Sequence, residues 1–331
     1  MSLNHAQTEA VAHNKGPCMV LAGPGSGKTL TIAKRIEYLI MKHKVRPEEI
    51  LVITFTKYAA WEMKNRTRSI CGPSSYAVTF GTFHGIYYGI LKWAYRLNQS
   101  NLLSDEEKYR ILREILPGID WDQEPEADEE KDYLQELAIE IGNVKNNCMD
   151  IEEYEPVKYT TEKFRKLYRT YEETKKKYRK IDFEDMLIQC RDLFMKRPDI
   201  LKKWQEKFQY ILVDEFQDVN QAQYDVVRML AAPQDNLFVV GDDDQSVYGF
   251  RGADTKLMLG FPNEFPGTRL VYLNTNYRCS SAIVESACRI IKNNKERYKK
   301  AIHSAFEKSQ CERVHVIEVD GMRQETDGIV H

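Results

Sequence analysis

A glycine-rich segment near the start of the chain has the residue types of a phosphate-binding loop. It reads Gly23-Pro24-Gly25-Ser26-Gly27-Lys28-Thr29 and lies between an apolar run at 18–22 and a pattern typical of a helix. Glycines let backbone N–H groups approach phosphate oxygens, and the helix N-terminus adds the positive end of its dipole. We therefore predict a nucleoside triphosphate site, with Lys28 on the β- and γ-phosphates and the Thr29 hydroxyl on Mg²⁺.

An acidic pair, Asp214-Glu215, directly follows an apolar run at 210–213. A carboxylate at the end of a strand beside a phosphate-binding loop is suited to anchor Mg²⁺, so we assign that role to Asp214. Glu215 is suited to orient and deprotonate an attacking water. Such pairs are common after strands and gain meaning only from the loop upstream. Together the two segments predict a nucleoside triphosphatase.

Strands and helices must alternate for these segments to meet. Apolar runs at 18–22, 50–55 and 77–80 predict strands, followed by helices to about Met41, over 59–67 and from about Phe83. Further strands are expected at 210–213, 237–240 and 269–273. Continuous apolar strands joined by helical crossovers indicate an α/β fold with a parallel sheet covered on both faces.

The interval 91–179 breaks this alternation, because it is charged and almost entirely compatible with helix. Its basic stretch, 162–180, is expected to be a solvated helix face. After Asn276 a new pattern predicts a helix over 281–293 and a strand over 313–319. We expect a first domain from 1–90 and 180–275, an inserted helical subdomain at 91–179, and the beginning of a second domain at 276–331.

Composition limits the class of protein. The 331 residues are 42% hydrophobic and 30% charged, which fits a globular protein with more than one core. No apolar run approaches the ~18 residues of a membrane span, and no signal peptide is visible. The seven cysteines are scattered, which favours reduced thiols and a cytoplasmic location. A net charge of -2 leaves room for a local basic groove.

Six strings resemble the motifs of the UvrD/Rep family of superfamily 1 helicases, in the family's order. They are Leu3-Asn4-His5-Ala6-Gln7, the segment 53–63, Gly81-Thr82-Phe83-His84, the segment 214–218, the segment 241–253 and Asn276-Tyr277-Arg278. The resemblance implies RecA-like domains, ATP and Mg²⁺ as cofactors, and single-stranded or partially duplex DNA as partner. It also implies an ATP-dependent DNA helicase that moves 3′ to 5′.

The resemblance also implies roles at the nucleotide. Gln7 would hydrogen-bond the adenine edge, and Arg35 and Tyr277 would stack on its two faces. Gln245 would sense the γ-phosphate, and Arg278 would reach it from the second domain and spread transition-state charge.

A second set of residues would line the path of the DNA strand. Aromatic side chains in such a path contribute ~1–3 kcal/mol per base by stacking and tolerate any sequence. For Phe55 and Tyr248, packing in the core is the alternative. The set is Phe55, Thr82, His84, Phe183, Tyr248, Phe250 and Arg251. Since Gln245 precedes Tyr248 by three residues, a shift of this loop with the state of the γ-phosphate could couple hydrolysis to stepping.

Two further functions remain open from sequence. One is a module that binds ATP and single-stranded DNA without motor activity, and the other is a small-molecule kinase. DNA-stimulated hydrolysis would separate a motor from both. The family's later motifs, including a second arginine finger, do not occur in the 331 residues. We therefore expect this chain to be the amino-terminal part of a motor and to unwind DNA poorly by itself.

Overall fold

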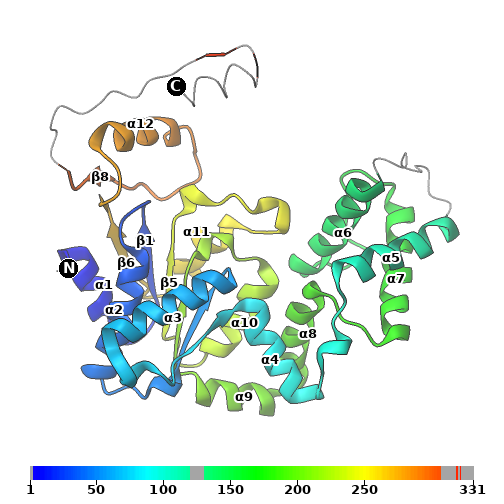
Figure 1. Cartoon of the computed structure of the whole chain (residues 1–331), viewed down its shortest axis with the longest axis horizontal. Coiled ribbons are helices and arrows are strands. Elements are labelled where there is room, and N and C mark those ends of the chain that lie inside the picture. Colours follow the sequence, from blue (N-terminus) through cyan, green and yellow to red (C-terminus); the bar gives the residue numbers. More distant parts are fainter. Residues whose placement is uncertain (1–2, 120–129, 307–317, 320, 322–331) are drawn as a thin grey trace.

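Six parallel strands form the sheet around which the chain is arranged (Figure 1). The computed structural model describes residues 3–119, 130–306, 318–319 and 321. The strand order is β3-β2-β4-β5-β1-β6, so strands from both sides of the helical interval share one sheet. Their bounds are β1 Cys18–Ala22, β2 Ile50–Thr54, β3 Thr79–Thr82, β4 Tyr210–Val213, β5 Leu237–Gly241 and β6 Arg269–Leu273. The predicted α/β class with a parallel sheet is confirmed.

The four inner strands β1, β2, β4 and β5 are buried on both faces, which explains why they are almost continuously apolar. Alternate residues of β4 show this, because Leu212 belongs to one core and Ile211 and Val213 to the other. Helices α1 (His5–Ala12), α2 (Lys28–Met41) and α3 (Lys57–Cys71) contribute to the first core. The second is covered by α4 (Phe83–Tyr95), α8 (Phe183–Lys196), α9 (Pro198–Lys207), α10 (Gln221–Ala231) and α11 (Thr255–Glu264).

A third core lies within the helical interval. Helices α5 (Asp105–Ile115), α6 (Glu130–Asn146) and α7 (Thr161–Tyr178) pack around it and form a group beside the sheet in Figure 1. Phe164, Leu167 and Tyr171 of α7 belong to this core.

Buried charges join this group to the sheet layer, at a place where solvated helix faces were expected. Lys175, from the basic stretch, is 1% exposed, and its ammonium lies 2.8 Å from Asp182 at the start of α8. Lys145 of α6 contacts the same carboxylate at 2.8 Å. Burial alone raises the pKa of Asp182, but the two ammonium groups reverse this and hold it well below its ordinary value. The basic stretch is therefore partly structural.

The remaining elements follow β6. Strand β7 (Thr275–Asn276) pairs with β8 (His303–Ser304), and α12 (Ser281–Ile291) lies between them in sequence. The predicted strand over 313–319 falls almost wholly outside the described residues. Among the described helices, none has both the length and the apolar character needed to cross a membrane.

Predicted element bounds differ from the observed ones where side chains cap helices. The helix predicted over 59–67 begins at Lys57, because the Thr56 side chain accepts a hydrogen bond from the backbone N–H of Ala59. The strand predicted at 77–80 extends to Thr82, which caps α4 in the same way.

We predict that Leu212→Ala, in the middle of the sheet, lowers the free energy of unfolding by about 2–5 kcal/mol, because it leaves a cavity between packed layers. Urea denaturation followed by circular dichroism measures this. Ile290→Ala is the control, since that side chain is 72% exposed and its loss should change stability by less than about 0.5 kcal/mol. Equal effects would contradict the described core.

Candidate functional site

The glycine-rich loop joins β1 to α2 in a conformation that only glycine adopts easily. Gly25 has φ 63° and Gly27 has φ 84°, both in the left-handed region. The Ser26 hydroxyl donates to the carbonyl of Gly23 at 2.7 Å and closes the loop on itself. This geometry leaves Lys28 at the first position of α2, at the carboxyl end of the sheet.

The acidic pair lies opposite this loop. The ammonium of Lys28 is 3.0 Å from a carboxylate oxygen of Glu215, which joins the segments after β1 and β4. Asp214 is buried and accepts a hydrogen bond from the backbone N–H of Glu215 at 3.0 Å. Burial, aided by Glu215 and opposed by Lys28, raises the pKa of Asp214 to about 7. A cation beside Asp214 would therefore have a large effect on its charge.

A second wall approaches the loop from the segment after β6. The side-chain amide of Asn276 donates to the carbonyl of Pro24 at 2.8 Å, and the N–H of Tyr277 donates to the carbonyl of Gly25 at 2.9 Å. A Cβ on Gly25 would lie 2.7 Å from the Cβ of Arg278, so only glycine fits. The structure thus places Tyr277 and Arg278 beside the loop.

The amino-terminal helix closes a third side. Gln7 is buried and its amide donates to the carbonyl of Ser26 at 2.9 Å. The side chain of Asn4 donates to the Tyr277 hydroxyl at 2.8 Å. Gln7 and Tyr277, which are far apart in the sequence, therefore both bind the glycine-rich loop.

Arg35 does not join this group, which corrects its predicted role. Its side chain is 2% exposed, its guanidinium stacks on the ring of Phe238 at 4.4 Å, and it donates to the carbonyls of Val11 and His13. These contacts lie in the core between the sheet and helices α1 and α2. They exclude stacking of Arg35 on a nucleobase opposite Tyr277.

The predicted strand-binding aromatics form two groups at the other end of the sheet. Phe55 lies 5.0 Å from Tyr248, which lies 6.0 Å from Phe250. His84 lies 5.4 Å from Phe183. Phe55 and Tyr248 are only partly buried and belong to none of the three described cores, which disfavours the core-packing alternative.

Two predicted strand-binding residues stand apart. The Thr82 hydroxyl accepts a hydrogen bond from the N–H of Gly85 and so serves as the cap of α4. The side chain of Arg251 lies outside the described part of the structure, so its predicted role stays a prediction.

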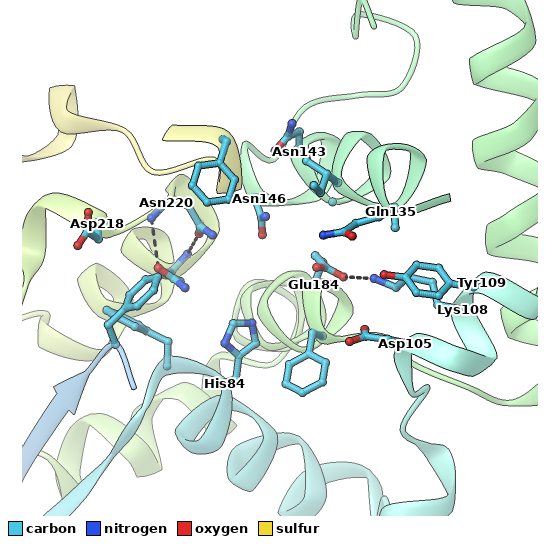
Figure 2. Close-up of a pocket in the computed structure, with 18 residues that line it drawn as sticks. His84, Asp105, Lys108, Tyr109, Gln135, Asn143, Asn146, Glu184, Asp218 and Asn220 are labelled. Atoms are coloured by element: carbon cyan, nitrogen blue, oxygen red, sulfur yellow. Dashed lines mark hydrogen bonds and ion pairs between the residues drawn. The ribbon is translucent and has the colours of Figure 1, made fainter. Parts of the chain in front are cut away.

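A cavity of about 480 Å³ separates the sheet domain from the helical group (Figure 2). Four predicted strand-binding residues line it: Phe55, His84, Phe183 and Phe250. Polar side chains of α5 and α6 line the opposite side. Burial lowers the pKa of His84, which favours the neutral imidazole.

Sequence comparison identifies the family. Residues 3–266 match the family model of the UvrD/REP helicase N-terminal domain, a range that holds the loop, the acidic pair and the cavity. The chain belongs to the UvrD/REP helicase family. It is 39% identical to YjcD of Bacillus subtilis over 92% of its length, and 34% identical to the ATP-dependent DNA helicase PcrA of Staphylococcus aureus over 99%. It spans 40% and 45% of these relatives, respectively.

Sequence reasoning missed one residue of this UvrD/REP domain that links the acidic pair to the loop after β5. Gln217 donates to Glu215 at 3.1 Å, and its side-chain oxygen accepts from the N–H of Asp242 at 2.9 Å. Asp242 in turn accepts from the Gln245 amide at 2.5 Å. Gln217 lies in the segment 214–218, one of the six strings that resemble the family motifs, but the sequence does not show what its side chain contacts. We call the segment 241–252 the coupling loop.

A second missed feature is a set of ion pairs that we call the clasp, formed by Asp242, Asp243 and Asp244 with Arg297 and Lys300. The fully buried Lys300 ammonium contacts all three carboxylates, at 2.5 Å from Asp243 and 2.8 Å from Asp244. Arg297 pairs with Asp244 at 2.5 and 2.7 Å. Burial lowers the pKa of Lys300, but the aspartates outweigh this and raise it.

We predict that Lys300→Met lowers the free energy of unfolding by about 3–5 kcal/mol, because three carboxylates lose the buried cation they share. Urea denaturation at neutral pH measures this. Lys299→Met removes an exposed neighbour and is the matched control. A change no larger than that of the control would show that the clasp does not stabilise the fold.

Proposed function

We propose that this chain is the nucleotide- and strand-binding part of an ATP-dependent DNA helicase that translocates 3′ to 5′ on single-stranded DNA. The observation that carries the proposal is the Lys28–Glu215 pair, 3.0 Å apart, at the edge where Gln7, Tyr277 and Arg278 also converge. Membership of the UvrD/REP family and the helicase name of the PcrA relatives support it. A small-molecule kinase does not fit this membership.

The near wall would bind the phosphates of ATP. The N–H groups of Gly23–Gly27 and the ammonium of Lys28 suit the phosphate oxygens, while Thr29 and Asp214 offer the hard oxygen ligands that Mg²⁺ takes. Bound Mg²⁺ would neutralise charge on the phosphates. Because a γ-phosphate would compete for Lys28, its arrival would release Glu215 to orient and deprotonate water.

The far wall would bind the base and the transition state. Gln7 would read the adenine edge, and Tyr277, which is 45% exposed, offers a free ring face for stacking. Arg278 is exposed above the loop and suited to reach the γ-phosphate. Because Arg35 is buried, only Tyr277 among the proposed residues would stack on the adenine, and it would cover one face.

The coupling loop would connect nucleotide to DNA. Gln217 links the first part of the loop to Glu215, and Gln245 bonds Asp242 within that first part. In the second part, Tyr248 contacts both Phe55 and Phe250. A change at the γ-phosphate would therefore be transmitted to the aromatic side chains through a few hydrogen bonds.

The domain borders belong to the same proposal: 1–90 with 180–275, an insertion at 91–179, and a second domain from 276. The separate core of the insertion supports them. A cytoplasmic location is proposed from the cysteines, since those described are all unpaired.

Lys28→Ala is expected to weaken binding of a fluorescent ATP analogue with Mg²⁺ by about tenfold or more, the effect of losing a hydrogen bond to a charged group. Equilibrium titration measures this. Lys42→Ala, an exposed lysine at the other end of α2, is the control and should bind normally. Normal binding by Lys28→Ala would remove the nucleotide site from the glycine-rich loop.

Single-stranded DNA is expected to stimulate ATP hydrolysis, and Gln245→Ala to lower the ratio of stimulated to basal rate. The reason is that Gln245 bonds Asp242, whose N–H is held by Gln217 beside Glu215, and stands three residues before Tyr248 in the coupling loop. Steady-state phosphate release with and without oligo-dT measures both rates. Absence of stimulation in the wild type would favour the non-motor module, and an unchanged ratio in Gln245→Ala would remove the coupling role.

A further inference from the structure

Two large aromatic side chains are exposed to solvent at the start of α3, shortly after Phe55 in the sequence. Tyr58 is 71% exposed and Trp61 is 59% exposed. Their ring centroids lie 5.9 Å apart and their planes meet at 33°, so they form a pair. Neither ring belongs to one of the three described cores. Neighbouring exposed rings of this size mark a surface at which another molecule binds.

The pair lies close to the proposed path of the DNA strand. Three peptide units separate the Cα atoms of Phe55 and Tyr58, and they span at most about 11 Å. The turn between them is fixed, because the Thr56 side chain accepts a hydrogen bond from the N–H of Ala59 at 3.0 Å. Tyr58 and Trp61 are not part of the cavity lining, whereas Phe55 is. They therefore continue the row of aromatic side chains beyond the border of the cavity.

Basic side chains share the same face of α3. At 3.6 residues per turn, Trp61 lies within about 60° of Lys57, Lys64 and Arg68 around the helix axis, and Tyr58 lies about 60° further on. Lys57 is exposed, and Lys64 and Arg68 are half-buried. Figure 1 shows α3 apart from the helical group that forms the other side of the cavity. This face of α3 thus combines rings with positive charge.

The only carboxylate of α3 does not cancel this charge. It belongs to Glu62, which pairs with Arg66 at 3.1 Å on the flank of the helix. The helix carries four basic residues against this one acidic residue, although the whole chain has a net charge of -2. Positive charge beside exposed rings is suited to a nucleic-acid strand, because the cations neutralise phosphates and the rings stack on bases.

A second contact between a cation and a ring lies at the other end of this face. The guanidinium of Arg68 is 4.9 Å from the ring centroid of Tyr76, which is also exposed. From Tyr58 to Arg68 the helix rises about 15 Å, which is room for about four stacked nucleotides at about 3.4 Å each. We call this surface the α3 strip, and it consists of Lys57, Tyr58, Trp61, Lys64, Arg68 and Tyr76.

We infer that the α3 strip binds single-stranded DNA next to Phe55, through stacking of bases on Tyr58 and Trp61 and through phosphate contacts of its basic side chains. The inference rests on the proposed function, since it needs a DNA strand along Phe55. An acidic protein segment would also match the charge, but the continuity with Phe55 favours the strand. Because stacking accepts any base, the strip adds affinity without sequence preference.

Fluorescence anisotropy of a fluorescein-labelled oligo-dT 20-mer, at neutral pH and fixed salt, tests this inference. Trp61→Ala is expected to raise the dissociation constant about tenfold, the effect of losing one stacked base. Trp93→Ala is the matched control, because Trp93 is about equally exposed but lies near the end of α4, away from the strip. It should bind as the wild type does. Circular dichroism checks the fold of each variant.

Tryptophan fluorescence reports the stacking itself, since a base stacked on an indole quenches its emission. Unlabelled oligo-dT should quench the emission of the wild type. Trp61→Phe, which keeps a ring for stacking, should bind nearly as tightly but lose most of this quenching. Trp93→Phe should retain it.

The phosphate contacts are tested by the dependence of binding on salt. Lys57→Gln should make the slope of log K against log salt concentration less steep by about 0.7, the effect of one phosphate contact on a single strand. Lys44→Gln, which changes an exposed lysine after α2, is the control and should keep the wild-type slope. Equal slopes in the two variants would overturn the phosphate contact.

Wild-type affinity in Trp61→Ala, or full quenching in Trp61→Phe, overturns stacking on the α3 strip. Either result leaves the proposed strand binding at the cavity intact, because the wild type still binds oligo-dT. Failure of the wild type to bind oligo-dT overturns the proposed function together with the strip.

Discussion

Parallel pairing is the constraint on which the whole arrangement depends. Since the six strands run in the same direction, their carboxyl ends meet along one edge, and every one leads into a segment of the candidate site. The neighbouring strands β4, β5, β1 and β6 lead to the acidic pair, the coupling loop, the glycine-rich loop and the segment with Tyr277. At the other end of the sheet, β2 and β3 lead to Phe55 and His84. The order of the β-strands alone therefore separates the proposed nucleotide-binding end of the sheet from the proposed DNA-binding end.

The coupling loop bridges these ends because of where β5 lies. Strand β5 lies between β4 and β1, so the coupling loop starts next to the acidic pair that follows β4. The loop then passes the end of β4 and reaches Phe55, which follows β2. The ring centroids of Phe55 and Tyr248 are 5.0 Å apart. Hydrogen bonds fix the first part of the loop, and exposed aromatic contacts hold the second. Such a division suits a loop whose first part stays fixed while the aromatic side chains of its second part change position.

Sequence reasoning succeeded where the relevant residues are consecutive. The loop around Lys28 and the pair at Asp214 are local patterns, and the strand after which each comes is continuously apolar, so both elements and their meeting at one edge could be predicted. The role that the resemblance gave Arg35 does not fit the structure, because a resemblance in sequence does not tell the buried face of α2 from the exposed one. Lys300 could not be found at all, since it lies 56–58 residues from the aspartates it contacts and no motif surrounds it.

The clasp also affects where this chain can be divided and recombined with a relative. The family match ends at residue 266, whereas both cations of the clasp come later, at Arg297 and Lys300. A chimera joined at the end of the family match would keep the three aspartates and take its cations from another relative. In this chain, the unit to be exchanged whole therefore extends beyond β6 and includes Lys300.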